Sequence, residues 1–212
     1  MKTLQEAQIL EDRLFNISIG VLLGDASIQK NKSKGVKKWR LKFSQGGKHR
    51  EYLYHLHSQF EEYVISDPSF NEARNMYSFQ TIFDSRFKVL ADLFLDPEGK
   101  KRVTDFFKEN PISPISLAYW FMDDGGLLSY KKDWPRRGLV FNTQGFTFDE
   151  VEILSQNLNQ FYNLKTWVKT NKKRPIIAVS GKEYQQISRV FLPHMHESMR
   201  YKLPIVKEID QA

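Results

Sequence analysis

Two aspartates, Asp25 and Asp124, hold equivalent places in the chain, each at the end of an apolar stretch that predicts a helix. The end of a helix is itself partly negative, so carboxylates that meet there need a positive counter-charge. Mg²⁺ suits this place, because it prefers oxygen ligands and binds few carboxylates together with phosphate. Beside a phosphodiester, such a cation lowers the pKa of bound water and stabilises charge on the attacking and leaving oxygens. The pair therefore indicates metal-dependent phosphodiester hydrolysis, provided that the two helices pack together.

The alternative interpretation is that both aspartates are ordinary surface residues at helix ends. It would be preferred for a single aspartate, but two at corresponding places in a duplicated, basic chain favour the metal site. Asp123 directly precedes Asp124, and neighbouring helical residues point about 100° apart, so we expect only one of them to face the cation. Asp124 is the favoured ligand, with Asp123 as a helix-end or supporting acid. Gly24, which precedes Asp25, is also included in the candidate metal site.

The chain contains two unequal copies of one unit, which is why the aspartates correspond. Four landmarks recur in the same order at nearly constant spacing. Asp25 and Asp124 are 99 residues apart, as are Gln45-Gly46 and Gln144-Gly145. The Phe-Leu pairs at 94–95 and 191–192 are 97 apart, and Lys101 and Lys202 are 101 apart. Chance would seldom produce this order. We expect units at 1–100 and 101–212 in one compact monomer.

Each copy predicts the same series of elements, αββαββα, from its hydrophobic periodicity and turn residues. The predicted order is an apolar helix, a hairpin, a helix, two strands and a helix. In the first copy these are 14–25, 27–45 with Lys34-Gly35 at the tip, 48–64, about 75–86, and 86–95. In the second they are 114–124, 127–144 with residues 135–138 at the tip, 147–161, 165–180 and 182–192. Two such units, each with a four-stranded antiparallel sheet, give a pseudo-twofold α+β protein.

The charge balance points to an anionic partner. Lys and Arg exceed Asp and Glu by 32 to 25, with pI ≈ 9.4, which favours nucleic acid ahead of a membrane surface. The segment 37–43 alternates basic with large apolar residues, which places the basic ones on one face of a strand. A β-ribbon of this kind fits the major groove of DNA, although an isolated hairpin would more simply be solvated. The candidate DNA-binding residues are Lys38, Arg40, Lys42, Lys172, Lys173 and Arg174.

Other classes of protein and site are disfavoured. The absence of cysteine excludes disulfides, thiolate zinc sites and a cysteine nucleophile. No apolar run approaches the length of a membrane span, and the first residues show no targeting pattern. We therefore expect a soluble protein made where it works, or one whose presequence is missing from this sequence. The two-residue spacings of His55 with His57 and His194 with His196 predict ordinary surface histidines.

These residues carry a resemblance to a known family. The segments SIGVLLGDA (18–26) and LAYWFMDDG (117–125) resemble the two motifs of single-chain LAGLIDADG homing endonucleases. The second half, with FNTQGFTFDEVE and the late YKLP, is similar to the mitochondrial omega-intron enzymes of that family. The resemblance covers nearly the whole chain and is weakest across 28–80. The first motif departs from the family pattern at Ser18 and Ala26, which makes the two sites chemically unequal.

The resemblance implies several properties. Asp25 and Asp124 would be metal ligands, and Lys101 and Lys202 would lie beside the two scissile phosphates, where each polarises the phosphate or orients water. The cofactor would be Mg²⁺, with Mn²⁺ as a substitute. The active form would be a monomer that binds a long asymmetric double-stranded DNA target and leaves a staggered break with 3′ overhangs. The compartment would be the mitochondrion, where close members are encoded in introns.

Two rival functions stay open at this point. An RNA-splicing maturase reuses the same fold, binds intron RNA and need not cleave DNA. It could lose either aspartate without harm, so the presence of both aspartates and both lysines argues for the nuclease, although one protein could do both. A DNA-binding regulator on the same scaffold would bind without cutting.

Overall fold

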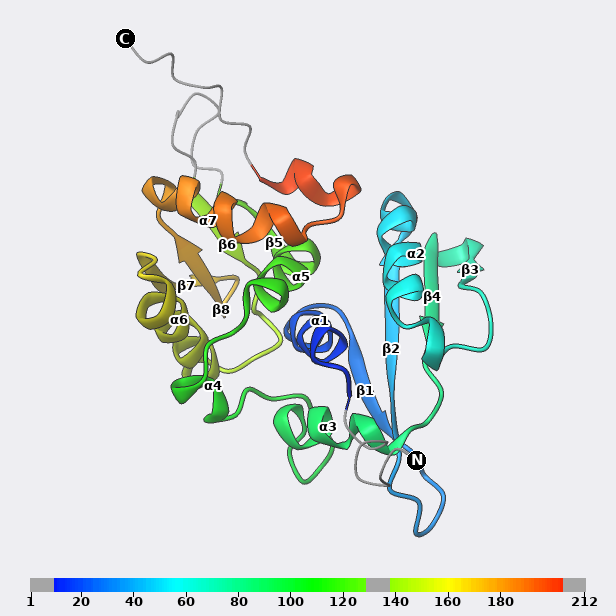
Figure 1. Cartoon of the computed structure of the whole chain (residues 1–212). Helices are drawn as coiled ribbons and strands as arrows, with labels where there is room; N and C mark the ends of the chain where they lie inside the picture. Colours follow the sequence, from blue (N-terminus) through cyan, green and yellow to red (C-terminus); the bar gives the residue numbers. More distant parts are fainter. Residues whose placement is uncertain (1–9, 129–137, 204–212) are drawn as a thin grey trace.

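The computed structural model describes residues 10–128 and 138–203, and two long apolar helices form its centre. Helix α1 (Asp12–Leu23) and helix α5 (Pro114–Asp124) lie against each other between two sheets (Figure 1). Ser113 begins α5, since its side chain accepts a hydrogen bond from the Ser116 N–H, and Pro114 occupies the first turn, where no backbone donor is needed. Both helices are buried on nearly all sides, as expected of helices that pack on each other and on a sheet.

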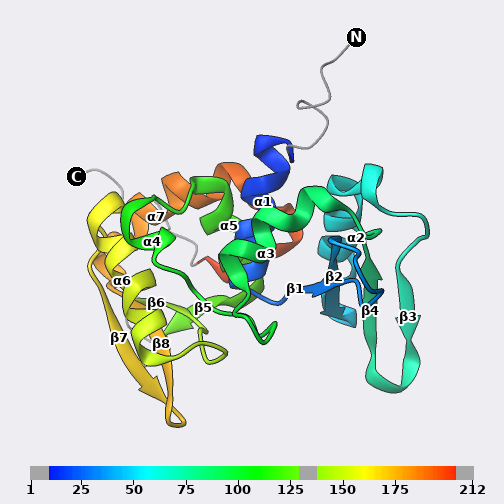
Figure 2. The ribbon, with the colours of Figure 1, turned by 90° about the horizontal axis from the view of Figure 1, so that it is seen from below.

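Each half contributes one four-stranded antiparallel sheet with the same strand order, β1-β2-β4-β3 and β5-β6-β8-β7. The two sheets lie on either side of the central helices (Figure 2). The identical order confirms the predicted pseudo-symmetric α+β fold. The strands are β1 (Ser27–Lys30), β2 (Trp39–Gly46), β3 (Ser69–Asn71), β4 (Met76–Gln80), β5 (Gly125–Leu128), β6 (Gly138–Phe141), β7 (Thr166–Asn171) and β8 (Arg174–Val179).

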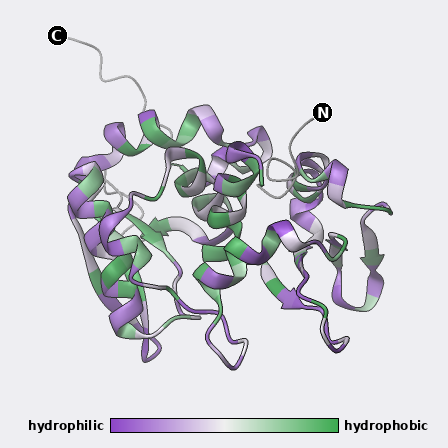
Figure 3. Cartoon of the chain, turned by 60° about the horizontal axis from the view of Figure 1, so that its bottom comes forward, coloured by the Kyte–Doolittle hydropathy of each residue, from purple (hydrophilic) through white to green (hydrophobic). Residues whose placement is uncertain are grey.

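Helices cover one face of each sheet and are apolar toward it. Figure 3 shows hydrophobic residues concentrated on the central helices and hydrophilic ones at the hairpin ends. Thr147 and Glu150 form a reciprocal capping box that begins α6, and Asn163 ends it in the left-handed conformation. The outer helices are α2 (Arg50–Gln59), α3 (Lys88–Phe94), α4 (Phe106–Glu109), α6 (Phe148–Tyr162) and α7 (Tyr184–Phe191).

Some elements lie elsewhere than the sequence pattern predicts. The second strand pair of the first unit lies at 69–71 and 76–80, not within 75–86, because the turn falls at 72–75. The Asn71 side chain caps a 3-10 turn there, and Asn75 takes a left-handed φ of 47°. The helix expected at 48–64 is shorter, since 3-10 turns flank α2 at Gly47–His49 and Glu61–Tyr63. Helix α4 and η8 (Glu197–Lys202) were not predicted. The expected tip at 135–138 lies largely outside the described residues.

Candidate active site and nucleic-acid interface

Helices α1 and α5 approach each other so closely that only small residues fit at the crossing. A Cβ built at Gly20 would lie 2.4 Å from the backbone oxygen of Ser116. The Ser116 hydroxyl donates to the Asn16 carbonyl at 2.7 Å, which joins the helices by a hydrogen bond. The small residues Gly20 and Ser116 thus make this contact, whereas Ser18 donates to its own helix, at the Leu14 carbonyl. The close crossing brings the two helix C-termini together.

Three aspartates lie where the two helices end, near enough for their charges to act on one another. Asp25 is exposed, and its backbone N–H donates to Asp123 Oδ2 at 3.2 Å. Asp123 and Asp124 are half-buried, and the charge of Asp25 acts on both. Helix α5 ends at Asp124 and the chain turns directly into β5, and the charge of Asp25 acts on both neighbouring acids. That only one of the two, Asp124, faces the cation stays a prediction.

Burial and mutual repulsion disfavour the charged forms of these acids. Burial, followed by the charges of Asp25 and Asp124, raises the pKa of Asp123 well above its usual range. Burial and Asp25 raise the pKa of Asp124 to about 7, against the opposing effect of Lys101 and Lys202. Ionising these acids together is therefore unfavourable unless a cation neutralises them, which is the electrostatic setting in which a cation binds.

The two lysines identified from the repeat both reach this place and bind the helix ends. Lys101 Nζ donates to the Gly24 carbonyl at 2.7 Å and to the Ala26 carbonyl at 3.2 Å. Lys202 Nζ donates to the carbonyls of Met122 and Asp123, the latter at 2.7 Å. Lys101 thus neutralises the partial negative charge at the end of α1, and Lys202 does so at the end of α5. Burial lowers the pKa of both lysines, while the nearby aspartates oppose this shift.

Gln45 is a site residue that the predictions from sequence did not include. Its Nε2 donates to Asp25 Oδ2 at 3.0 Å and to Asp123 Oδ1 at 3.1 Å, so one amide spans carboxylates from both halves. Its side chain is buried, at the end of β2. The sequence repeat could have identified Gln45, because Gln45 and Gln144 recur at the same spacing as Asp25 and Asp124. In the second half, Gln144 Nε2 donates instead to Asn142 Oδ1 at 3.4 Å.

The donor chemistry of the site fits Mg²⁺. Among the described residues, no three acidic or histidine side chains converge as a complete ligand set. Mg²⁺ does not require one, because it is usually held by one or two carboxylates, waters and substrate phosphates. The aspartates in the described part of the chain offer oxygen donors, and burial together with mutual repulsion disfavours their ionised forms unless a cation is bound. The Gly24 carbonyl, which belongs to the candidate metal site, is hydrogen-bonded to Lys101.

The first sheet presents a polar and basic face away from its helices. In β2, residues alternate strictly between buried and half-buried positions, and Arg40 and Lys42 share the open face. Register places Gln29 opposite Arg40, and Arg40 donates to Gln29 Oε1 at 3.3 Å from Nη2. Lys38 is exposed just before the strand. The predicted alternation of 37–43 is therefore present from Trp39 onward.

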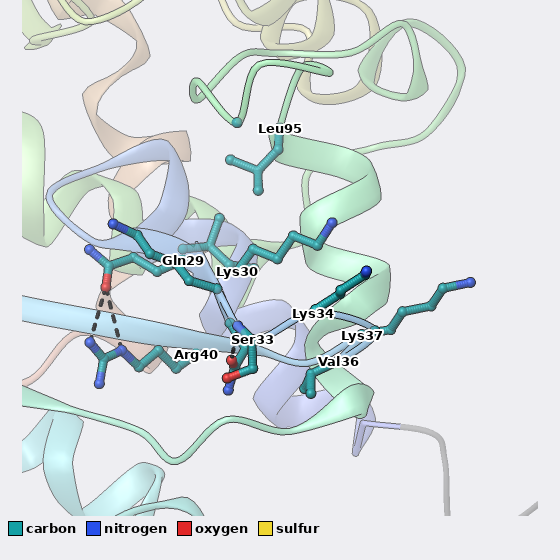
Figure 4. Close-up of a pocket in the computed structure, with 13 residues that line it drawn as sticks. Gln29, Lys30, Ser33, Lys34, Val36, Lys37, Arg40 and Leu95 are labelled. Atoms are coloured by element: carbon teal, nitrogen blue, oxygen red, sulfur yellow. Dashed lines mark hydrogen bonds between the residues drawn. The ribbon is translucent and has the colours of Figure 1, made fainter.

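A basic pocket lies at the end of this sheet, where the β1–β2 loop faces the segment after α3. Figure 4 shows Lys30, Lys34 and Lys37 extending around it, beside Leu95 and the bonded pair Gln29 and Arg40. Lysines have long, flexible side chains, and when spread along a loop they provide positive charge without a fixed geometry. Such charge suits phosphate better than base edges.

The second sheet is different in character. Val140, Ile176 and Ala178 are buried on the side opposite the helices, where the first sheet carries charged and polar residues. Its positive charge gathers at the β7–β8 turn, where Lys172, Lys173 and Arg174 are exposed. Both lysines take left-handed conformations, with φ of 47° and 64°. Such turns favour Asn and Gly, so two lysines there hold a backbone conformation that is unfavourable for their side chains.

Two of the histidines are not ordinary surface residues, contrary to expectation. His55 in α2 shares a 2.8 Å hydrogen bond with the Tyr119 hydroxyl in α5, and its ring lies 4.6 Å from that of His196. Burial, with the nearby His196 and Arg13, lowers the pKa of His55 to about 4. The sequence could not predict this, because the contact joins residues 64 positions apart. These rings form part of the interface between the halves.

No helix in the described part of the chain is long and apolar enough to cross a membrane. The chain is 38% identical to probable intron-encoded endonuclease 1 of Wickerhamomyces canadensis, over 87% of this chain and 81% of that protein. It is 28% identical to cytochrome b mRNA maturase bI2 of Saccharomyces cerevisiae, over 92% of this chain but 48% of that protein. The narrower resemblance to the omega-intron enzymes stays a prediction.

Solved structures show the same fold. The homing endonuclease I-WcaI bound to its DNA recognition sequence superposes with a TM-score of 0.82 and 34% identity, covering 97% of this chain and 93% of that one. I-DmoI in complex with DNA and Mn matches with a TM-score of 0.53 and 14% identity, covering 85% and 96%, and shows the fold alone. The model of the LAGLIDADG DNA endonuclease family matches residues 15–187. With its duplicated motif helices, paired sheets and related sequence, the chain belongs to the LAGLIDADG DNA endonuclease family.

Proposed function

We propose that this chain is a monomeric homing endonuclease that cuts both strands of a long, asymmetric double-stranded DNA site with Mg²⁺. The observation that carries the proposal is the meeting of Asp25, Asp123 and Asp124 between two lysines at the crossing of α1 and α5. We further propose that residues 1–100 and 101–212 are the two units, so that each binds half of the target. Because the faces of the two sheets differ, the halves of the target differ too.

In this proposal Asp25 and Asp124 hold Mg²⁺, with Asp123 and the Gly24 carbonyl at the edge of the site. The cation, when bound, lowers the pKa of water and stabilises charge on phosphate oxygens, and Mn²⁺ can replace it. I-DmoI, which shares the fold, has been solved with DNA and Mn, which supports a divalent cation.

The chain's own residues orient the reacting groups. Gln45 holds the carboxylates of Asp25 and Asp123 in fixed positions through its amide. Lys101 and Lys202 place one positive charge at each helix end, where each would stabilise developing negative charge on a scissile phosphate. The sheets carry Lys38, Arg40 and Lys42 in one half and Lys172, Lys173 and Arg174 in the other, which we assign to DNA contacts. The expected product is a staggered break with 3′ overhangs.

The test is cleavage of a plasmid library with randomised inserts, in Mg²⁺ and in EDTA, at low salt. We expect Mg²⁺ to give breaks at one enriched asymmetric sequence, and EDTA to abolish them. Asp25→Asn and Asp124→Asn should each abolish cutting while binding of the selected site persists. Uncut DNA in Mg²⁺, or normal cutting by both variants, would contradict the proposal.

A second function, intron-RNA binding as a maturase, is favoured by one observation, the relationship to cytochrome b mRNA maturase bI2. That relationship and the intron-encoded relative also support a mitochondrial origin. Binding to structured intron RNA, measured beside binding to the selected DNA, separates the two functions. RNA binding without DNA cleavage would replace the nuclease proposal, whereas both activities together would identify a dual-function protein.

A further inference from the structure

Tyr201 and His49 join the two halves of the protein beside the carboxylate cluster. His49, in the 3-10 turn after β2, shares a 2.8 Å hydrogen bond between its Nε2 and the hydroxyl of Tyr201 in η8. The other ring nitrogen, Nδ1, lies 3.2 Å from Gln45 Oε1. Tyr201 directly precedes Lys202. A continuous series of hydrogen bonds therefore runs from the aspartates through Gln45 and His49 to the second half.

The direction of each bond in this series follows from Gln45. Its NH₂ group faces two carboxylate oxygens, which only accept in the ionised form that the proposed cation requires, so its carbonyl oxygen faces His49. His49 Nδ1 must then carry a proton and donate to Gln45. In the neutral ring, Nε2 has a lone pair and accepts from the Tyr201 hydroxyl. Flipping the Gln45 amide would turn its oxygen toward the carboxylates and lose both of its bonds to them. The ionised aspartates thus select the orientation of the amide, and His49, backed by Tyr201, holds its carbonyl oxygen from the other side.

The second half has no counterpart of this series among the residues that the structure describes. Gln144, which corresponds to Gln45, meets Asn142 at 3.4 Å. The position that corresponds to His49, 99 residues later, is Phe148, an exposed apolar residue. Position 100, which corresponds to Tyr201, is a lysine. The two sites of this nominally symmetric protein therefore hold their glutamines by different means.

We propose that His49 and Tyr201 are positioning residues that hold Gln45 for the cleavage of one DNA strand and not the other. The inference rests on the proposed endonuclease function and deepens it. Neither residue needs to touch the reacting phosphate, because both act through the Gln45 amide. Tyr201 is 60% exposed, so water can reach its hydrogen bond with His49. We therefore expect this bond to contribute no more free energy than an ordinary hydrogen bond. Its loss should slow one strand roughly two- to tenfold.

The experiment uses the full chain and its selected target, with a different label on each strand, in single-turnover cleavage with Mg²⁺. Tyr201→Phe removes only the hydroxyl, and Tyr54→Phe removes the same atom from another exposed tyrosine as the control. His49→Phe removes both bonds, whereas the side-chain amide of His49→Asn can still donate to Gln45. DNA binding is measured for each variant in EDTA.

We expect Tyr201→Phe and His49→Phe to slow the same single strand, to accumulate nicked plasmid and to leave DNA binding unchanged. His49→Asn should cut faster than His49→Phe, and Tyr201→Phe should have no further effect in the His49→Phe background, because the residues act as one unit. Equal slowing of both strands, unchanged rates, or a loss explained by weaker binding would overturn the inference. Failure of the unaltered protein to cut would instead overturn the proposed function.

Discussion

Gly24, which caps the C-terminus of α1, lies directly against Asp123 in α5, with no room for a side-chain atom between them. A Cβ at Gly24 would meet Asp123 Cβ at 2.5 Å and its Oδ2 at 2.6 Å. Gly24→Ala must therefore displace the carboxylate that bonds to the Asp25 N–H and Gln45. We expect cleavage to fall about a hundredfold or more, in line with losses of aligned charge at a reacting group. The free energy of unfolding should fall by about 1–3 kcal/mol, as for other overpacked sites.

Gly145→Ala is the matched control, because no atom lies within 4 Å of a Cβ built there. Single-turnover cleavage and urea unfolding of both variants separate loss of chemistry from loss of stability. A Gly24→Ala protein that cuts at the normal rate would show that the close approach has no bearing on the site.

Lys101 and Lys202 should contribute far more to cleavage than to stability. Each caps a helix end, a contribution of about 0.3–1 kcal/mol, but each is also the positive charge placed at one half of the site. Lys101→Met and Lys202→Met are expected to lower the cleavage rate by about two orders of magnitude while the free energy of unfolding changes little. Lys100→Met, at an exposed neighbour, serves as the control. A rate loss no larger than the stability loss predicts would contradict this role.

The loop lysines around the basic pocket should bind phosphate and not read sequence. Replacing Lys34 and Lys37 by Ala is expected to weaken binding equally for the target and for unrelated DNA. The slope of log affinity against log salt should become shallower by about 0.9 for each phosphate that the variant no longer neutralises. Arg40→Ala, on the sheet face, should instead change the preferred base at one or more target positions. Fluorescence anisotropy across a salt series and selection from a randomised target measure the two effects.

We expect the lysines of the β7–β8 turn to lower the stability of the fold while raising its affinity for DNA. Lys172 and Lys173 both have left-handed backbones, which disfavour most side chains by about 1–2 kcal/mol each. The double variant Lys172→Asn with Lys173→Gly suits this turn, so its free energy of unfolding should rise. Its DNA affinity at low salt should fall, because two positive charges are lost. Denaturant unfolding and anisotropy test both directions, and a variant that is more stable with unaltered affinity would remove these lysines from the interface.

Acid should destabilise the interface between the halves through His55. Its folded pKa of about 4 lies below the ordinary value of 6.5, so below pH 6.5 the unfolded chain takes up a proton that the folded chain does not. Stability from the neutral ring is complete above pH 6.5 and is lost as pH falls toward 4. The groups facing His55 are Tyr119, Tyr52, His196 and Arg13.

His55→Gln removes this titration while leaving the other groups that titrate over the same range. The free energy of unfolding in urea is measured between pH 4 and 8 for the unaltered protein and for His55→Gln. The difference between the two curves gives the contribution of His55. Stability of the unaltered protein should fall more steeply with acid than that of His55→Gln. Parallel curves would show that this ring is not held neutral.

Much of the fold could be predicted because the signals in the sequence are periodic and duplicated. The motif helices and first hairpins were found within a few residues, since long apolar runs and the alternation in 39–43 have a single structural solution. The second strand pair of the first unit, at 69–80, was predicted at the wrong position. Its turn is made by the Asn71 side chain, which accepts a hydrogen bond from the Arg74 N–H, and not by a Gly or Pro that the sequence would reveal. Short 3-10 elements such as η8 carry no periodic signal.

The sequence repeat predicted the site residues that occur in both copies. Residues whose hydrogen bonds join the two halves were missed. The spacing of Asp25 and Asp124 identified two residues that the helix crossing brings together, and the spacing of Gln45 and Gln144 contained information that went unused. The bond from His49 to Tyr201 spans 152 positions and has no equivalent in the described part of the other copy, so no repeat could indicate it. The apolar outer face of the second sheet was not predicted, because a shift of one residue in strand register exchanges the two faces of a strand.

The positions of Lys101 and Lys202 determine where parts of two related proteins can be joined in a chimera. Lys101, the first residue after the 1–100 unit, bonds to the end of α1, and Lys202 bonds to the end of α5, whereas Ser116 and Gln45 bond between the two motif helices and the residues around them. The lysine that serves α1 thus lies just beyond the unit that contains that helix. A chimera built from two relatives keeps each lysine with its helix only if the two parts are joined after position 101. Whether such a chimera cleaves DNA depends on the few residues, such as Ser116 and Gln45, whose hydrogen bonds join the two halves.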